Sequence, residues 1–173
     1  QRSSRTCIYE ITADQAKHIH QTEFYKIFSD TWLNKLVDTF PADSVYEGKW
    51  PAGHYLCVHA DRGNLSLEYR QESDIRVSLL NNSRDLNVQV TRLDGSYIPN
   101  TRVWLEKKAL RYQPKNRIFK QKKSKKEGLL TVEAGGNTFY YQLDNEQRYR
   151  PLPAKVIIKL AYTPPIRWLW RPW

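Results

Sequence analysis

Short segments in which apolar and polar side chains alternate follow one another from about residue 54 onward. Alternation with a period of two is the pattern of a strand buried on one face. Glycine, proline and asparagine clusters separate the segments at intervals of about eight to twelve residues, which is typical of antiparallel sandwiches. The strands expected on this basis are residues 54–60, 65–69, 75–80, 86–91, 101–107, 110–112, 118–120, 129–134, 138–143 and 155–162. The pattern predicts a mainly β protein with an immunoglobulin-like antiparallel β-sandwich.

Three turns between these segments have clear residue signals. Asp94-Gly95 supplies the positive φ of a tight turn, and Pro99-Asn100 sets a second bend before the strand at 101–107. Gly135-Gly136 predicts a hairpin turn. If that hairpin forms, Leu130 and Val132 are expected to face Phe139 and Tyr141.

The N-terminal part of the chain is less regular. Thr12 and Gln15 have the spacing of a capping box, and apolar residues follow at helical spacing, so the pattern predicts a helix from residue 12 to about 30. A competing interpretation places two strands at 24–28 and 32–37, where aromatic and β-branched residues are frequent. Further on, Pro51 and Gly53 enforce a bend that leads into an alternating strand.

At 173 residues, the chain is long enough for one good core or two small ones. Six tryptophans and eleven tyrosines argue against disorder. No run of eighteen apolar residues or signal peptide is visible, and the chain begins with Gln. We expect it to be cut from a longer protein. The expected divisions are an N-terminal segment with the closing strands of a first module (1–72), a β-sandwich (73–162) and a linker (163–173).

The expected linker holds three tryptophans and three prolines in eleven residues. Prolines at this density exclude a regular helix, and three exposed tryptophans are unfavourable in a free tail. The tail is expected to dock on its own domain or on a further domain. Attachment to a membrane surface is the alternative.

The net charge of +10 comes from one segment. No acidic residue occurs between residues 107 and 126, whereas the rest of the chain contains eighteen basic and eighteen acidic residues. The ten cations are Lys107, Lys108, Arg111, Lys115, Arg117, Lys120, Lys122, Lys123, Lys125 and Lys126. They indicate either a solvated hairpin tip protected by lysines or a contact site for polyanions. Tyr112 and Phe119 alone are too few aromatics for a stacking platform, so no specific nucleic acid is expected.

Cys7 and Cys57 are the only cysteines. They belong to no Cys-x-x-Cys pair, which disfavours zinc binding and thioredoxin-type chemistry. A disulfide between them in an oxidising compartment and two buried free thiols are equally compatible with the sequence.

Catalytic and metal-binding patterns are weak. His18 and His20 point apart on a helix, and neither they nor His54 and His59 have an evident third metal ligand. The nearest approach to a carboxylate pair is Glu72 with Asp74, two residues apart at a strand start. No Gly-x-Ser-x-Gly elbow or glycine-rich phosphate loop occurs. We therefore expect no enzyme, no cofactor and no metal.

Four segments resemble the N-terminal part of bacterial alpha-2-macroglobulin-family proteins. They are Val77-Ser78-Leu79-Leu80, Leu86-Asn87-Val88-Gln89-Val90, the Asp94-Gly95-x-x-Ile98-Pro99-Asn100-x-x-Val103 turn, and Gly128-Leu129-Leu130-Thr131-Val132. The bend at Trp50-Pro51-Ala52-Gly53-His54-Tyr55 resembles the strand entry that often precedes them. The likeness covers residues 38–162 and lies in the order of the elements, because other sandwich domains share the single turn motif.

This resemblance implies a large secreted or lipid-anchored periplasmic protein built from tandem macroglobulin-like sandwiches. Such proteins trap proteases through a bait region, and many carry a Cys–Gln thioester. Neither feature maps onto this chain, since neither cysteine has a Cys-x-x-Gln pairing. The resemblance implies a non-catalytic scaffold piece, with other domains of the parent chain as partners and proteases reached through the parent protein.

The alternative hypothesis is a secreted binding module for polyanions or carbohydrate that uses the basic segment 107–126. Trp104, which points opposite to Val103 and Leu105, is a candidate stacking face in that case. Such a Trp more often fills the second face of a sandwich.

Overall fold

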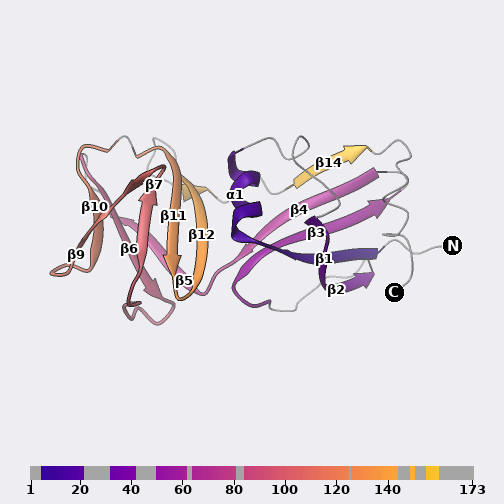
Figure 1. The fold of residues 1–173 in the computed structure, drawn as a ribbon, viewed down its shortest axis with the longest axis horizontal. Coiled ribbons are helices and arrows are strands. Elements are labelled where there is room, and N and C mark those ends of the chain that lie inside the picture. The colour runs from indigo at the N-terminus through magenta and orange to yellow at the C-terminus, as the bar shows by residue number, and fades with distance from the viewer. Residues whose placement is uncertain are drawn as a thin grey trace. The chain divides into compact units, whose positions relative to one another are not determined.

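The computed structural model describes residues 5–21, 32–41, 50–61, 64–80, 84–124, 126–143, 149–150 and 155–159. The chain divides into two compact units (Figure 1). The first comprises residues 1–72 and 153–173, and the second comprises residues 73–152.

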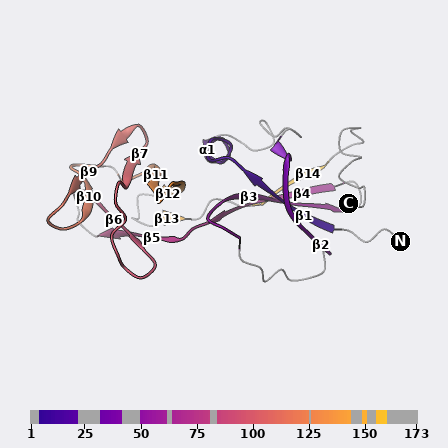
Figure 2. The ribbon, with the colours of Figure 1, turned by 60° about the horizontal axis from the view of Figure 1, so that its bottom comes forward.

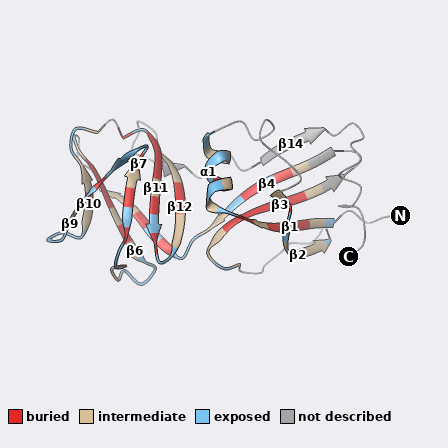
Figure 3. Ribbon diagram, in the orientation of Figure 1, coloured by how far each residue is buried: buried red, intermediate tan, exposed pale blue. Residues whose placement is uncertain are grey.

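The first unit contains a five-stranded antiparallel sheet in the order β14-β4-β3-β1-β2 (Figure 1). Its strands are β1 (Arg5–Ile11), β2 (Lys35–Pro41), β3 (Gly53–Asp61), β4 (Asn64–Glu72) and β14 (Lys155–Lys159). On one face of the sheet, buried side chains of three neighbouring strands meet: Tyr9 lies opposite Leu56, which in turn lies opposite Tyr69. This face forms the core of the unit, as the buried parts of β1, β3 and β4 show in Figure 3.

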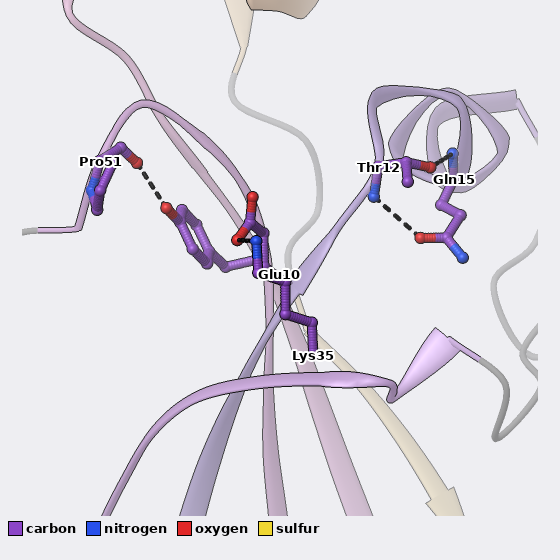
Figure 4. Close-up of polar contacts among 6 residues, drawn as sticks. Glu10, Thr12, Gln15, Lys35 and Pro51 are labelled. Atoms are coloured by element: carbon purple, nitrogen blue, oxygen red, sulfur yellow. Dashed lines mark hydrogen bonds and ion pairs between the residues drawn. The ribbon is translucent and has the colours of Figure 1, made fainter.

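Helix α1 (Ala13–Gln21) follows β1 and contacts the same face of the sheet (Figure 2). Its buried residue is Ala16, and the His20 ring meets the Tyr69 ring edge-on at 5.7 Å. The capping box predicted from the sequence is formed: the Thr12 amide donates to Gln15 Oε1 at 2.9 Å, and the Gln15 amide donates to Thr12 Oγ1 at 3.1 Å (Figure 4).

The structure tests the predictions for residues 12–37 only in part. The described helix ends at Gln21, and the expected continuation to residue 30, like the competing strand at 24–28, lies outside the described residues. The strand expected at 32–37 begins three residues later, as β2 (Lys35–Pro41). Strand β1 was not predicted at all. Ile8 is as deeply buried as its neighbours Cys7 and Tyr9, so the alternation that marks a half-buried strand is missing there.

The second unit is a β-sandwich of two antiparallel sheets (Figure 1). One sheet has the order β5-β6-β10-β9, and the other has the order β13-β12-β11-β7-β8. The strands of the first sheet are β5 (Ile75–Leu80), β6 (Leu86–Arg92), β9 (Arg111–Gln113) and β10 (Ile118–Gln121). Those of the second are β7 (Arg102–Leu105), β8 (Lys108–Ala109), β11 (Gly128–Ala134), β12 (Asn137–Leu143) and β13 (Tyr149–Arg150).

The core of this unit lies between its sheets. Val88, Leu130, Val132 and Phe139 are fully buried. Within the hairpin β11–β12, Leu130 lies opposite Tyr141 and Val132 lies opposite Phe139, which confirms the predicted pairs. The expected mainly β fold with an antiparallel β-sandwich is therefore confirmed.

The predicted turns also form. Gly95 has a φ of 87°, and its amide donates to the Arg92 carbonyl at 2.9 Å. The Asp94 carboxylate accepts hydrogen bonds from the Ser96 amide at 2.9 Å and the Ser96 hydroxyl at 2.6 Å. Gly135 and Gly136 both have positive φ, as a two-residue hairpin loop requires.

The expected sandwich boundary at residue 162 is wrong. Strand β14 does not extend the sandwich: it pairs with β4 of the first unit, with Lys155 opposite Glu68 and Lys159 opposite Asn64. The chain thus returns to its N-terminal unit after the sandwich, a long-range pairing that no local pattern encodes. The expected linker at 163–173 lies outside the described residues.

In the part of the chain that the structure describes, no helix is both long enough and apolar enough to cross a bilayer.

Candidate functional site

The basic segment occupies one lateral edge of the second unit. Strand β8 lies at one edge of the β13-β12-β11-β7-β8 sheet, and β9 lies at one edge of the β5-β6-β10-β9 sheet. A single residue, Leu110, connects these two strands. Leu110 is buried, and its amide donates to the Val103 carbonyl at 2.8 Å. Leu110 therefore fixes the crossing between the sheets, so both basic edge strands lie on the same side of the sandwich.

The predicted cations differ in their exposure and pairing. Seven are exposed and have no acidic partner among the described residues: Lys107, Lys108, Arg111, Lys115, Arg117, Lys122 and Lys123. Lys120 forms an ion pair of 3.3 Å with Asp85. Lys126 is only 7% exposed, so it is not part of the exposed set, contrary to expectation. Lys125 lies outside the described residues.

Asp85 anchors the connection that follows β10. Its carboxylate accepts a hydrogen bond from the Lys123 amide at 3.2 Å and pairs with the Lys120 ammonium group. The Lys123 amide hydrogen bond and then the Lys120 contacts lower the pKa of Asp85 below its usual value. No local sequence pattern predicts this role, because Asp85 precedes its partners by more than thirty residues.

Three aromatic rings form a stack beside the basic edge. Tyr97 stacks on Tyr112 with ring centroids 5.6 Å apart, and Tyr112 meets Phe119 at 5.0 Å. The guanidinium of Arg117 lies over the Tyr97 ring at 5.7 Å. Tyr97 comes from the turn before β7 and was not predicted to join the two aromatics of the basic segment.

The other candidate stacking residue, Trp104, is half-buried, whereas Val103 and Leu105 are buried. It lies on strand β7 between Thr131 and Ala109. Its position on the outer face of its sheet agrees with the alternation read from the sequence.

The two cysteines are free thiols and lie on neighbouring strands. Cys7 is opposite Val58, and Cys57 is opposite Ile8. Residues opposite one another share a face, and successive residues alternate, so Cys7 and Cys57 point to opposite faces of the sheet. A disulfide between them is incompatible with this register.

Each thiol has its own environment. Cys7 is buried beside Tyr9. The pKa of the Tyr9 hydroxyl is raised well above its usual value, mainly because the group is buried and also because Cys7 is close to it. Burial, followed by the Glu68 carboxylate, raises the pKa of Cys57 to about 11. A thiol with such a high pKa is protonated at neutral pH and is a weak nucleophile.

Two of the histidines lie close together where helix α1 packs on the sheet: His20 is on α1 and His54 is on β3. The His54 Nδ1 atom lies 2.6 Å from the Tyr69 hydroxyl, and their rings stack at 5.9 Å. His20 meets the same tyrosine edge-on from the helix. Burial, then the proximity of His54, lowers the pKa of His20 to about 3. The sequence singled out both histidines but not the tyrosine between them.

The remaining predicted polar residues lie in separate places. Among the described residues, no three His, Cys, Asp or Glu side chains converge as metal ligands would. Glu72 forms an ion pair of 3.0 Å with Arg70. Asp74, in the other unit, lines an open hollow of about 350 Å³ together with Arg92, Leu93 and Asp94.

No family model and no curated protein matches the chain. Two matching solved structures are both of native alpha-2-macroglobulin from Escherichia coli, each 17% identical with a TM-score of 0.57. One spans domains NIE-MG1; the match covers 82% of this chain and 84% of that one.

The other spans domains MG0-NIE-MG1, with 83% of this chain and 55% of that one covered. The chain thus spans about half the length of the longer structure. The likeness confirms the expected macroglobulin-like fold.

Proposed function

We propose that the chain is a pair of scaffold domains from the N-terminal part of an alpha-2-macroglobulin-like protein that traps proteases. The observation that carries this proposal is the match over both units at once. A structure restricted to domains NIE-MG1 is covered to 84%, and the match takes in 82% of this chain. Two adjacent domains with the same order are a more specific likeness than a single sandwich, which many unrelated proteins contain.

The uses of the polar side chains support a structural role. Asp94 fixes a turn, Thr12 and Gln15 cap a helix, and the Glu106 carboxylate accepts a hydrogen bond from the Leu129 amide at 2.9 Å. These groups hold local backbone conformations. In this proposal the chain is not an enzyme, and its partners are the other domains of the parent chain. The parent protein is periplasmic or extracellular, either secreted or lipid-anchored.

The proposal is tested with the full-length gene product. A trapping protein encloses a protease without blocking its active site, so trypsin mixed with the full product should still cleave a small peptide substrate but not a large protein. The isolated 173-residue chain should protect neither substrate. A gene product that ends near residue 173, or one that blocks cleavage of both substrates equally, would contradict the proposal.

A further inference from the structure

The edge of the sandwich formed by β8 and β9 combines two features that are not required in a merely solvated loop. It carries a dense row of exposed cations, and it presents two strands, β8 and β9, that have a strand neighbour on only one side among the described residues. The exposed cations on and beside these strands are Lys107, Lys108, Arg111, Lys115 and Arg117.

Among the described residues, the nearby carboxylates form no ion pair with this row. Glu106 directs its carboxylate to the Leu129 amide, and Asp85 pairs with Lys120 farther along the segment. The opposite edge of the β5-β6-β10-β9 sheet offers a contrast: on β5, the one basic residue, Arg76, donates to the Leu93 carbonyl at 3.3 Å. The exposed cations of the basic segment thus include a group of five on and beside β8 and β9, whereas β5 carries a single basic residue.

The aromatic stack narrows the class of ligand. Tyr112 contacts a ring on either side, and Arg117 lies over Tyr97, so these faces are already occupied within the protein. Single-stranded nucleic acids are held by bases stacked on free aromatic faces, and this edge offers none at these positions. Recognition here must rest on charge and on hydrogen bonds from the open strand edges.

We propose that the β8/β9 edge binds an anionic polysaccharide. Sulfate or carboxylate groups of such a polymer pair with the row of Lys and Arg side chains. Its hydroxyl groups both donate and accept hydrogen bonds, so they match the alternating N–H and C=O groups of an open strand edge, whereas a phosphate backbone only accepts them. This function is independent of the scaffold role proposed above.

The test uses two variants of the 173-residue chain with equal net charge. The edge variant carries Lys107→Gln, Lys108→Gln, Arg111→Gln and Lys115→Gln. The control variant carries Arg5→Gln, Lys17→Gln, Lys35→Gln and Arg76→Gln, four exposed cations outside the edge. Both lose four charges, so an attraction that depended on net charge alone would weaken equally. Circular dichroism and thermal melting verify that both variants fold.

Binding of a size-defined heparin oligosaccharide is measured by calorimetry across a salt series. We expect the edge variant to bind about ten-fold more weakly or worse near 100 mM salt, with a salt dependence reduced by about three in log–log slope. The control should remain within about two-fold of wild type. Equal losses in both variants, or no binding by wild type, would overturn the proposal. So would a DNA duplex of matched charge that binds as tightly as heparin and is equally weakened by the edge substitutions.

Discussion

Gly128 lies directly against the side chain of Glu106. Glu106 Oε1 accepts a hydrogen bond from the Leu129 amide at 2.9 Å, and the Glu106 amide donates to the Leu129 carbonyl at 2.8 Å. A Cβ atom added at Gly128 would overlap Oε1 and lie 2.9 Å from the Glu106 Cγ atom. Gly128 also has a φ of +122°, which side chains other than glycine rarely adopt. The turn after β7 and the start of β11 are thereby joined at a position that has no room for a methyl group.

Gly128→Ala should therefore destabilise the chain by about 2–4 kcal/mol, since backbone strain adds to the displacement of the Glu106 carboxylate. Urea-induced unfolding followed by tryptophan fluorescence measures this change. Gly95→Ala is the matched control: its φ is +87°, but the space around it is open, so strain alone should cost about 1 kcal/mol. Equal losses in the two variants would show that the contact with Glu106 has no energetic role.

Much of the sandwich was predictable because its signals are local. A Gly135-Gly136 turn determines which residues face each other in the hairpin, and Asp94-Gly95 positions the following strand through contacts within a few residues. The pairing of β14 with β4 was missed because it joins residues about ninety positions apart. Strand β1 was missed because burial of Ile8 on the second face removed the alternation.

The candidate site was predictable only in its composition. The absence of acidic residues between 107 and 126 was visible in the sequence. That β8 and β9 are edge strands on the same side of the sandwich depends on strand order, which the sequence does not show. The same holds for Tyr97, whose stacking on Tyr112 joins the segment before β7 to strand β9. It also holds for the opposite faces to which Cys7 and Cys57 point.

The capping box of α1 should contribute measurably to stability. In Thr12→Ala the Gln15 amide loses its acceptor, and in Gln15→Ala the Thr12 amide loses its own. Each change should cost about 1 kcal/mol in the free energy of unfolding. Lys17→Ala, on an exposed position of the same helix, should leave stability unchanged to within about 0.5 kcal/mol. Urea denaturation of the three variants provides the comparison, and a Thr12→Ala variant as stable as wild type would contradict this assignment.

The thiols should remain reduced in air and react slowly in the native state. Intact mass spectrometry without reductant should show no loss of two hydrogens, and at neutral pH iodoacetamide should modify both cysteines rapidly only after denaturation in guanidinium chloride. Because the pKa of Cys57 is raised to about 11, its slow native alkylation should accelerate about ten-fold per pH unit between pH 8 and 10. Cys57→Ser should abolish this pH-dependent component, whereas Cys7→Ser should leave it in place. A monomer with a Cys7–Cys57 crosslink would refute the register of β1 and β3.

Mild acid should weaken the docking of α1 on its sheet through His20. Its pKa is about 3 in the folded chain, against an ordinary value of 6.5, because burial and His54 disfavour the charged form. Between these values the unfolded chain binds a proton that the folded chain does not, so stability is complete above about pH 6.5 and falls as the pH decreases toward 3. Because His20 is only half-buried, solvent screens part of this difference, and we expect the free energy of unfolding to fall by about 3 kcal/mol over this range. Urea midpoints measured from pH 7.5 to 4 should decline less steeply in His20→Gln than in wild type. His18→Gln, an exposed change on the same helix, should keep the wild-type slope; if His20→Gln keeps it too, the decline has its origin in other groups.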